Sequence, residues 1–571
     1  MHIFLATLAL GALLGACSKN RLTVTQAPRP APEAPALSEA PVERDPNVIV
    51  DFLEYSVRRP LSHVFIPPRA LRSWLGSKVE AYNPTAEDDV VNSSWFTHRN
   101  GKRRMTRDEV ARGPGDGTGP DTSGTWTVFR ANKEGVTPGF MLQDAAGVGY
   151  LVKFDPPDYA ELASSAEVIT SRLLHASGYF VPECAVTYID PSNVRAAEGL
   201  TFEDPLGRES PVGDDFVQEL LRPVPRRADG KVRAAACKLL SGTLGPFDYE
   251  GMRDEDPADS IPHEHRRELR GLYVLAAWLN HLDTKQHNSL DILVDEGGQK
   301  RVVHYLIDFG SSLGSAALRP NAPRDGVEHD VDLAAIGARW VTAGFYSKSW
   351  ERYRQPPTHP AVGFYSADLF DPGNWKNNYP NPAFQNHTVR DGYWGAKLVA
   401  SFDEEQIRAA VAAGQLSDPG AADALTRAII ARRDLTVAYW YLRVTPLEEL
   451  SIEGSAQAPI LGFRDLAVSE GVVPADGRRY EMRFDFPAAR IRTEHVREPR
   501  ISAGGEGQLE LPGPPSDAAF WQELRSQAIA KQLAMLELRA IAADDAPRPR
   551  SVRIYLLPVE EAGYRIVGRA Y

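Results

Sequence analysis

Four polar residues near the middle of the chain have types and spacing suited to phosphoryl transfer. Asp283 is followed by Lys285 and Asn288, and Asp308 comes later in the same region. In this reaction a carboxylate positions the proton of the attacking hydroxyl, and a lysine offsets charge on the moving phosphoryl group; Asp283 and Lys285 suit these roles. An amide and a second carboxylate hold the Mg²⁺ that bridges the phosphates, and we assign this role to Asn288 and Asp308. The pattern predicts a site that uses ATP and Mg²⁺.

The elements that position these residues are also visible in the sequence. Two β runs, residues 291–294 and 301–307, flank a glycine turn at residues 296–298, which predicts a hairpin leading to Asp308. A strongly apolar stretch, residues 269–280, predicts a helix that ends just before the catalytic loop. A structural alternative is a solvated polar loop beside an aspartate that caps a turn.

His281-Leu282-Asp283 with Lys285 and Asn288, followed by a strand and Asp308-Phe309-Gly310, resembles the catalytic loop and metal-binding segment of the protein-kinase-like superfamily. The resemblance implies an ATP- and Mg²⁺-dependent phosphotransferase. It also implies an α+β, bilobal fold with a β-rich upper lobe and an α-rich lower lobe.

Upstream residues supply a second part of this pattern. Three antiparallel strands are expected within residues 125–154, with Lys153 near the end of the third, and residues 159–176 have the period of an amphipathic helix. In the family, such a lysine pairs with a helix glutamate and is held toward the ATP phosphates. Glu167 is the expected partner and Glu161 is the competing one, although both are also typical of a solvated helix face.

The connection between the first two strands can cover a phosphate. It contains Gly135 and ends at Gly139, and its backbone N–H groups can face phosphate oxygens. This loop is more similar to the phosphate-covering hairpin of phosphatidylinositol kinases and toxin-type bacterial serine kinases than to the glycine loop of typical protein kinases. An ordinary hairpin connection is the alternative.

The rest of this region is expected to complete the kinase-like order. Residues 182–189 and 215–221 predict strands that lead to a hinge, and residues 222–265 predict a long connecting segment. Residues 329–340 predict a helix. Residues 344–395, rich in aromatic side chains, Asn and Pro, predict an irregular surface insertion, with a substrate-binding loop as the alternative. Three helical stretches follow up to residue 442, with a capping box at Asp403 and Gln406.

We divide the chain by composition and pattern. The predicted units are a signal peptide over 1–17, a Pro/Ala-rich tether over 18–46, an extension over 47–124, a kinase-like domain over 125–445 and a β-rich accessory domain over 446–571. The accessory domain is predicted from alternating runs at residues 480–486, 551–557 and 563–571, with one helix or part of a strand within 521–542.

The N-terminus points to a membrane-associated protein. A short apolar run ends in Leu14-Gly15-Ala16-Cys17, which resembles the lipobox of bacterial lipoproteins, in which the cysteine becomes the lipidated first residue. The run is too short for a stable transmembrane span. The resemblance implies a lipid anchor at Cys17 in the bacterial cell envelope, and Ser18 suggests the outer membrane. A buried N-terminal strand or helix is the alternative.

Charge and cysteine content exclude some functions. The net charge of −12 leaves no basic excess for nucleic acid binding. Three cysteines are too few for a disulfide framework. Cys184 and Cys237 pair in an oxidising compartment or remain two buried thiols, and the sequence leaves both open.

Three functions are consistent with these patterns. The first is a lipid-anchored phosphotransferase that uses ATP and Mg²⁺ and acts on a protein, a lipid headgroup or a small molecule. The second is a kinase-fold scaffold without transfer, which is favoured by the scarcity of ATP outside the cytoplasm. The third is an AMP transferase, because it needs the same metal and phosphate groups.

Overall fold

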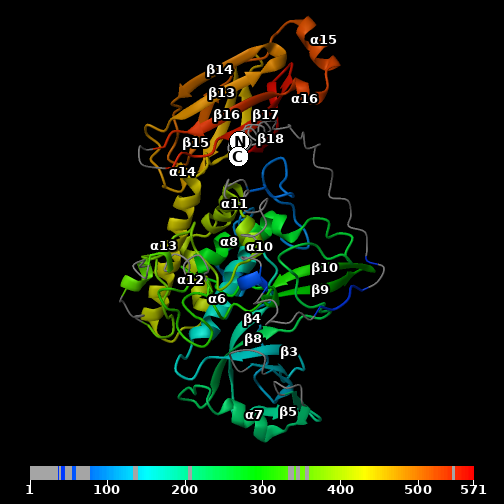
Figure 1. Ribbon diagram of the computed structural model, residues 1–571, viewed down its shortest axis with the longest axis vertical. Coiled ribbons are helices and arrows are strands. Elements are labelled where there is room, and N and C mark those ends of the chain that lie inside the picture. The colour runs from blue at the N-terminus through cyan, green and yellow to red at the C-terminus, as the bar shows by residue number, and fades with distance from the viewer. Residues whose placement is uncertain are drawn as a thin grey trace, which may run out of the picture.

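The molecule combines helices with several β-sheets, so the predicted α+β class is confirmed. In Figure 1 the computed structural model forms three tiers along its long axis: a β-sheet with α7 at one end, helices in the middle and two further sheets at the other end. It describes residues 37, 40–44, 54–58, 78–132, 139–203, 209–331, 340–342, 348–353, 359–542 and 547–571.

A six-stranded sheet forms the first tier, in the order β4-β8-β3-β2-β1-β5. Its strands are β1 (Trp126–Asn132), β2 (Gly139–Gln143), β3 (Gly149–Phe154), β4 (Cys184–Ile189), β5 (Val194–Ala196) and β8 (Val232–Lys238), and a separate small hairpin pairs β6 (Thr201–Glu203) with β7 (Glu209–Pro211). The three antiparallel strands expected upstream are confirmed as β1, β2 and β3. Helix α6 (Leu162–Ser177) follows β3 and ends at Gly178, whose φ of 127° suits only glycine well.

Two expectations in this tier are wrong. Residues 215–221, expected as a strand, belong to helix α7 (Asp214–Leu221). Val217 and Leu221 are buried one helical turn apart, and the acidic first turn suits the positive end of the helix dipole. The strand that enters the sheet is β8, within the stretch expected to be only a connection. It lies between β4 and β3 and is buried at six of its seven positions, so it shows no alternation of polar and apolar residues.

The hairpin and the helix expected around the catalytic loop are confirmed. β9 (Ser289–Glu296) pairs with β10 (Gln299–Leu306), and the turn between them has positive φ at both Gly297 and Gly298, as a tight two-residue hairpin requires. Helix α8 (Arg267–Leu279) is buried along its whole length and ends at Asn280, which adopts the left-handed conformation. This end delivers His281 and the following loop to the edge of the helical tier.

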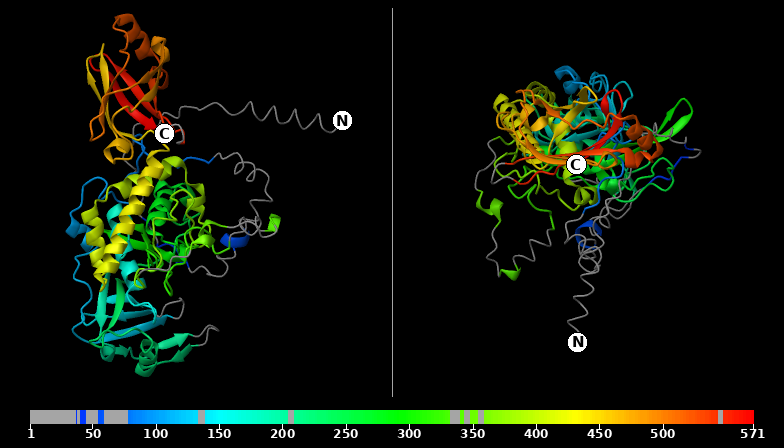
Figure 2. Two further views of the ribbon diagram at one scale, coloured as in Figure 1. Left: turned by 90° about the vertical axis from the view of Figure 1, so that its left-hand side faces the viewer. Right: turned by 90° about the horizontal axis from the view of Figure 1, so that it is seen from above.

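The helical tier packs around α8. It contains α5 (Arg107–Arg112), α10 (Pro382–Asn386), α11 (Val389–Ala400), α12 (Glu404–Ala413) and α13 (Pro419–Tyr441). The three helical stretches predicted up to residue 442 are therefore confirmed, as is the capping box in which Asp403 and Gln406 bond each other's backbone N–H. Figure 2 shows α13, in yellow, running along the long axis toward the C-terminal sheets. One large apolar cluster, including Trp278 and Trp394, joins these helices.

The C-terminal tier contains two sheets, and the predicted β-rich character of residues 446–571 is confirmed in its strands. The three-stranded sheet has the order β11-β12-β15 and the five-stranded sheet the order β14-β13-β16-β17-β18. The strands are β11 (Leu447–Gly454), β12 (Pro459–Asp465), β13 (Tyr480–Phe486), β14 (Ile491–Arg497), β15 (Glu506–Glu510), β16 (Ala534–Ala540), β17 (Val552–Val559) and β18 (Gly563–Ala570), with short helices α14 (Leu466–Ser469), α15 (Ala518–Ser526) and α16 (Ile529–Gln532).

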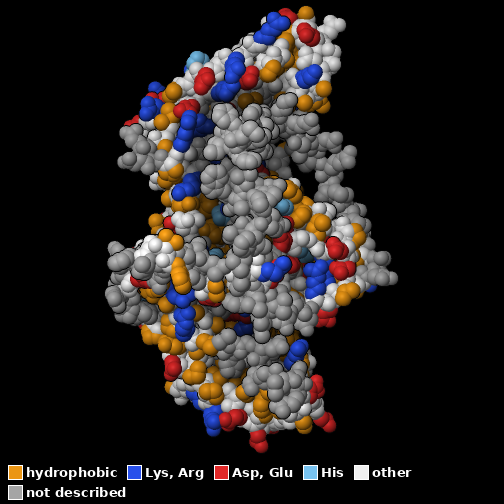
Figure 3. Space-filling view, viewed as in Figure 1, with side chains coloured by type: hydrophobic (Ala, Val, Ile, Leu, Met, Phe, Trp, Pro, Cys, Tyr) orange, Lys and Arg blue, Asp and Glu red, His pale blue; other side chains and the backbone are white. Residues whose placement is uncertain are grey.

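These strands alternate between a shared apolar core and a polar face. On the visible polar face, acidic and basic side chains are interspersed, as Figure 3 shows over this tier. Cross-strand ion pairs such as Glu481–Arg539 and Glu537–Arg553 account for part of this mixture. The pattern is that of a solvated sheet face.

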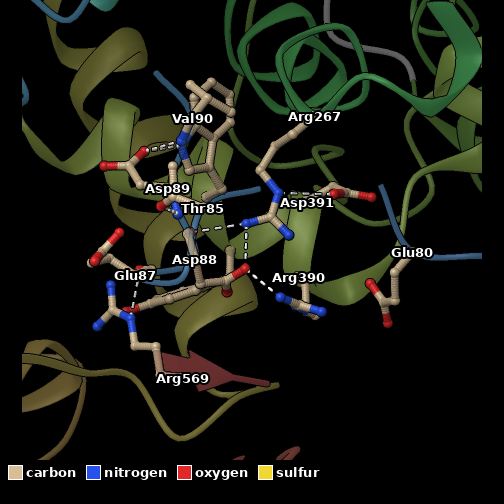
Figure 4. A network of polar contacts seen from close by, with 12 residues as sticks. Glu80, Thr85, Glu87, Asp88, Asp89, Val90, Arg267, Arg390, Asp391 and Arg569 are labelled. Atoms are coloured by element: carbon tan, nitrogen blue, oxygen red, sulfur yellow. Dashed lines mark hydrogen bonds and ion pairs between the residues drawn. The ribbon is translucent and has the colours of Figure 1, made fainter. Parts of the chain in front are cut away.

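The described part of the extension, from residue 78, packs against the helical tier. Asp88 is buried and accepts hydrogen bonds from Arg267 at 2.6 Å and from Arg390, while Arg267 also pairs with Asp391 at 3.2 Å (Figure 4). The backbone carbonyl of Glu87 accepts a bond from Arg569 of β18. The extension therefore contacts both the helices and the C-terminal tier.

Several expectations fall outside the described residues: the signal peptide, the lipidation site Cys17, most of the tether, Gly135 and most of the helix expected over 329–340. Short single turns occur at Glu54–Arg58, Pro191–Asn193, His263–His265, Gln286–Asn288, Ser349–Arg352 and Pro487–Ala489. Within the part of the chain that the structure describes, no helix combines the length and the apolar character needed to span a bilayer.

Candidate active site

Lys153 lies between two carboxylates that come from distant parts of the chain. Its Nζ is 2.6 Å from Oδ1 of Asp308 and 3.5 Å from Oε2 of Glu167. Oε2 of Glu167 also accepts the backbone N–H of Phe309 at 3.0 Å. Strand β3, helix α6 and the segment after β10 therefore meet at one ammonium group, as the sequence predicts.

The register of the sheet explains why Lys153 faces this point. Lys153 lies directly opposite Gly139 on one side and Ala235 on the other, so the start of β2 borders the lysine. Glu167 is buried on α6 with only 2% of its side chain exposed. Glu161, the competing partner, lies at the N-terminal end of the helix and accepts the backbone N–H of Ser417 instead.

The segment that carries Asp308 has an unusual backbone. Asp308 has a φ of 62°, in the left-handed region, where a short polar side chain is tolerated best. The turn that follows is fixed by two bonds, from Leu282 N–H in the loop after α8 to the Ser311 carbonyl at 3.0 Å and from Leu313 N–H to the Leu279 carbonyl at the end of α8 at 2.8 Å. These bonds hold Asp308 beside the loop that follows α8.

The loop after α8 holds the remaining predicted residues together. Lys285 Nζ is 3.0 Å from Oδ2 of Asp283, and the Asn288 side chain donates to the Asp283 carbonyl at 2.7 Å. The Asn288 carbonyl accepts the N–H of Ile307 at 3.0 Å, which ties the loop to the end of β10. Because the Asn288 amide nitrogen is used in this way, its side-chain oxygen is the atom suited to a cation.

The charges of these groups affect one another. Burial raises the pKa of Asp308, but the charge and hydrogen bond of Lys153, followed by the charge of Lys285, outweigh it and lower the pKa below its usual range. Burial raises the pKa of Glu167, and the charge of Lys153 offsets only part of that rise. Lys153 remains charged because the two carboxylates raise its pKa against the effect of burial. The site therefore favours an ionised Asp308 beside an ammonium group.

The surroundings of His281, the first residue of the motif, indicate a role in packing. It is buried, and its ring meets the ring of Phe309 edge-on at 5.5 Å. Burial lowers its pKa, so the ring is neutral. His281 thus packs the turn after β10 onto the loop after α8 and does not face the carboxylates as a charged group.

Contacts from the insertion over residues 344–395 were not foreseen. Asn377 donates to the Thr284 hydroxyl at 2.8 Å and Asn381 donates to the Thr284 carbonyl at 3.0 Å. All three residues are buried, so this part of the insertion is not an irregular surface segment. The cluster of Asn residues in the sequence was the available signal, but spacing along the chain does not reveal a partner so far away.

The cysteine pair, left open by the sequence, is a disulfide in the structure. Cys184 of β4 and Cys237 of β8 are directly opposite each other in the sheet, with 4.0 Å between their Cα atoms. Sγ of Cys237 is 3.7 Å from Oε1 of Glu167. Because both sulfurs are used in the bond, these three side chains do not form a metal site in this state.

No protein-family model and no curated protein sequence matches this chain. Two solved structures of the Golgi casein kinase, one of them with Mn and ADP bound, align with it at 10% sequence identity. They cover 57% of this chain and 73% and 72% of the kinase chains, with TM-scores of 0.24 and 0.23. At this level the kinase structures are weak neighbours, and they decide neither the reaction nor the cofactor of this protein.

Proposed function

We propose that this protein is an ATP-dependent, kinase-like phosphotransferase. The observation that carries the proposal is the placement of Lys153 between Glu167 and Asp308, from three separate elements. A lysine that is paired with a helix glutamate and lies beside a metal-binding aspartate is the arrangement that orients nucleotide phosphates in protein kinases. A solvated polar loop would give no reason for these three groups to meet.

In this proposal each tier of the structure has its own role. We assign the six-stranded sheet and α6 to an upper lobe, the helical tier to a lower lobe and the C-terminal sheets to an accessory domain. The connection after β8 would be the hinge, because its backbone bonds reach β9: Leu293 N–H donates to the Gly242 carbonyl at 2.7 Å. The adenine would then dock on backbone groups near this connection.

The oxygen ligands present suit Mg²⁺. This ion is commonly held by one or two carboxylates together with substrate phosphates. Asp308, with 43% of its side chain exposed, supplies a carboxylate, and Asn288 supplies an amide oxygen. Bound there, the ion would neutralise charge on the phosphates.

The other residues act on the acceptor. Asp283, held by Lys285 at 3.0 Å, would orient the acceptor hydroxyl and take its proton. Lys285 would then stabilise charge on the transferred phosphoryl group. Both side chains are partly exposed, as groups that meet a second substrate must be. The acceptor class stays open among proteins, lipid headgroups and small molecules.

We further propose that the protein acts in the bacterial cell envelope, anchored through lipid on Cys17. The disulfide between Cys184 and Cys237 supports an oxidising compartment, since such bonds persist there and are rare in the cytosol. The lipobox-like sequence supports the anchor itself. Metabolic labelling with a fatty acid, lost in the Cys17→Ser variant, tests this assignment.

Nucleotide binding is tested first. A thermal shift with Mg²⁺ and ATP is expected for the natural protein and is expected to disappear in Asp308→Asn. Asp254→Asn, which changes an exposed acidic residue outside the site, is the matched control and should keep the shift. An equal shift in both variants would contradict the proposed site.

Transfer is tested with labelled ATP. Transfer of the γ-phosphate to the protein or to added envelope extract supports phosphorylation, whereas transfer of the α-phosphate identifies an AMP transferase. Asp283→Asn should reduce transfer by about 10²-fold or more, as expected for loss of a general base, while the thermal shift remains. Nucleotide binding with neither kind of transfer identifies a scaffold and overturns the enzymatic proposal.

A further inference from the structure

The disulfide shares one face of the sheet with Lys153. Opposite residues in an antiparallel sheet point to the same side. Cys184, Cys237 and Leu151 form one such row, and Val186, Ala235 and Lys153 form the next row along the same strands. Helix α6 covers this face, because Glu167 contacts Lys153 and Val168 packs in the small apolar cluster around the two cysteines. The disulfide is thus part of the wall behind Glu167.

The two oxygens of Glu167 have different surroundings. Oε2 receives the Phe309 N–H at 3.0 Å and lies 3.5 Å from Lys153. Oε1 faces Sγ of Cys237 at 3.7 Å. A sulfur within a disulfide has no proton to donate, so it fixes Oε1 by packing and not by a hydrogen bond. The carboxylate is therefore held by donors on one side and by the disulfide on the other.

Reduction would change the space available to Glu167. Two thiol sulfurs that are no longer bonded cannot remain at bonding distance and must move apart. Cys184 is fully buried among Val168, Val186 and Ala235, so it has little room to move. Cys237 is 8% exposed, and Oε1 of Glu167 lies in contact with it. The displaced sulfur would press on the carboxylate that pairs with Lys153.

We propose that the Cys184–Cys237 disulfide keeps both sulfurs clear of Glu167, and that reduction to two crowded thiols displaces this carboxylate and disturbs the nucleotide site. The expected effect on ATP binding rests on the proposed function, whereas the expected displacement of Glu167 does not. A dithiol reductant attacks Sγ of Cys237, the more exposed sulfur, and the bonding electron pair passes to Cys184, which takes a proton. The second thiol of the reductant then closes its own disulfide and releases Cys237 as a thiol. In a chain kept reduced in the cytosol, the site would remain disturbed until export.

The experiment compares full-length protein in the oxidised form and after treatment with dithiothreitol. The first readout is hydrogen exchange of the Phe309 amide, which Glu167 protects. The second is binding of ATP with Mg²⁺. Reduction is expected to speed exchange at Phe309 and to weaken ATP binding by about fivefold or more, the size of a typical coupling between two sites. Unchanged exchange and unchanged affinity would mean that the bond only links β4 to β8, and would overturn the proposal.

A variant separates crowding from loss of the bond. Cys237→Ala removes the bond together with the sulfur that would press on Glu167. It is expected to keep slow exchange at Phe309 and to be insensitive to dithiothreitol, and the double variant Cys184→Ala/Cys237→Ala provides the same test without a free buried thiol. If both variants are folded yet show the fast exchange of the reduced natural protein, crowding is not the cause and the proposed mechanism fails.

The failure of the proposed function would look different. If neither redox form binds ATP while reduction still speeds exchange at Phe309, reduction displaces Glu167 but this residue does not serve a nucleotide site. In that case the structural inference stands and the proposed function falls. Cys17 is present in all forms, so differences between the natural protein and the variants come from the cysteine pair.

Discussion

Lys153, Glu167 and Asp308 place one positive charge beside two negative ones in a partly enclosed site. Asp283 and Lys285 add a pair with no net charge. The cluster as a whole therefore carries one excess negative charge when all groups are ionised. A divalent cation would reverse this balance and leave net positive charge for phosphates, which explains why a metal and a lysine are combined in such a site.

Glu167→Gln tests the ion pair while keeping the side-chain volume. The amide can still accept the Phe309 N–H, but it cannot pair with the ammonium of Lys153. Loss of a charge-assisted bond worth about 1.5–3 kcal/mol should weaken binding of ATP with Mg²⁺ by about tenfold or more, measured by calorimetry. The thermal midpoint should stay or rise, because burial raises the pKa of Glu167 and ionising it is costly.

Glu161→Gln is the matched control on the same helix. Glu161 accepts a backbone bond from Ser417, which glutamine can also do, whereas Lys153 forms its ion pairs with Glu167 and Asp308. The ATP affinity of Glu161→Gln should remain within about twofold of that of the natural protein, a difference well under about one kcal/mol. Equal losses in the two variants would show that helix α6 matters only as a whole.

Elements with a clear period were predictable, and elements without one were not. The helix that carries Glu167, the glycine turn between β9 and β10 and the capping box of α12 follow from local rules, and the structure confirms them. The amphipathic character expected for that helix is wrong, because every residue of α6 except His175 is buried. β8 was missed because a strand with neighbours on both sides and both faces covered loses its alternation. α7 was taken for a strand because eight residues give few turns from which to recognise a helical period.

The residues of the candidate site could be selected from the sequence, but the contacts that support them could not. Lys153, Glu167, Asp283 and Asp308 lie in motifs whose spacing is set by local geometry. The bonds from Asn377 to Thr284 and between Cys184 and Cys237 join residues far apart in the chain, and no local pattern encodes such a pairing. Sequence spacing therefore indicates the candidate residues, while tertiary packing decides what holds them.

We expect His387, at the junction between α10 and α11, to make stability depend on pH. Burial lowers the pKa of His387 to about 4, and the charge of Lys78 acts in the same direction. The ring stacks on Tyr273 with 4.3 Å between centroids, so a charged imidazole is disfavoured there. The unfolded chain takes up the proton near the ordinary value of 6.5 and the folded protein only near 4. Stability is therefore full above about pH 6.5 and falls as the pH drops toward 4.

His387→Gln removes this titration. The loss assigned to His387 amounts to as much as about 3 kcal/mol, given 1.36 kcal/mol per pKa unit, and the variant should lose less stability than the natural protein over this range. Urea unfolding at pH 7 and pH 4.5 measures the difference. His495→Gln, at an exposed position on β14, should leave the pH dependence unchanged. If His387→Gln keeps the same pH dependence of stability as the natural protein, that dependence comes from other buried groups.

On the scale of the whole molecule, the segment from residue 78 to residue 90 joins the helical tier to the C-terminal sheets. Asp88 binds Arg267 of α8 and Arg390 of α11 (Figure 4). The neighbouring backbone binds β18: the Ala86 carbonyl accepts the Arg569 N–H at 2.8 Å, and the Glu87 carbonyl accepts its side chain at 2.7 Å. An N-terminal segment thus fixes the last strand of the chain to the helices beside the site.

Asp88→Asn tests whether this segment fixes the tiers to each other. Asn tolerates the left-handed backbone of Asp88, whose φ is 58°, so the change removes charge with little backbone strain. It leaves Arg267, which is fully buried, with less compensation, and breaking a buried pair in this way costs about 3–5 kcal/mol. Urea unfolding should show the loss, and the amide of Arg569 should exchange faster. Glu87→Gln changes only an exposed side chain beside Asp88, and it should leave the free energy of unfolding and the exchange of the Arg569 amide unchanged. If Asp88→Asn changes these two measurements no more than Glu87→Gln does, the tiers are held together by their apolar contacts instead.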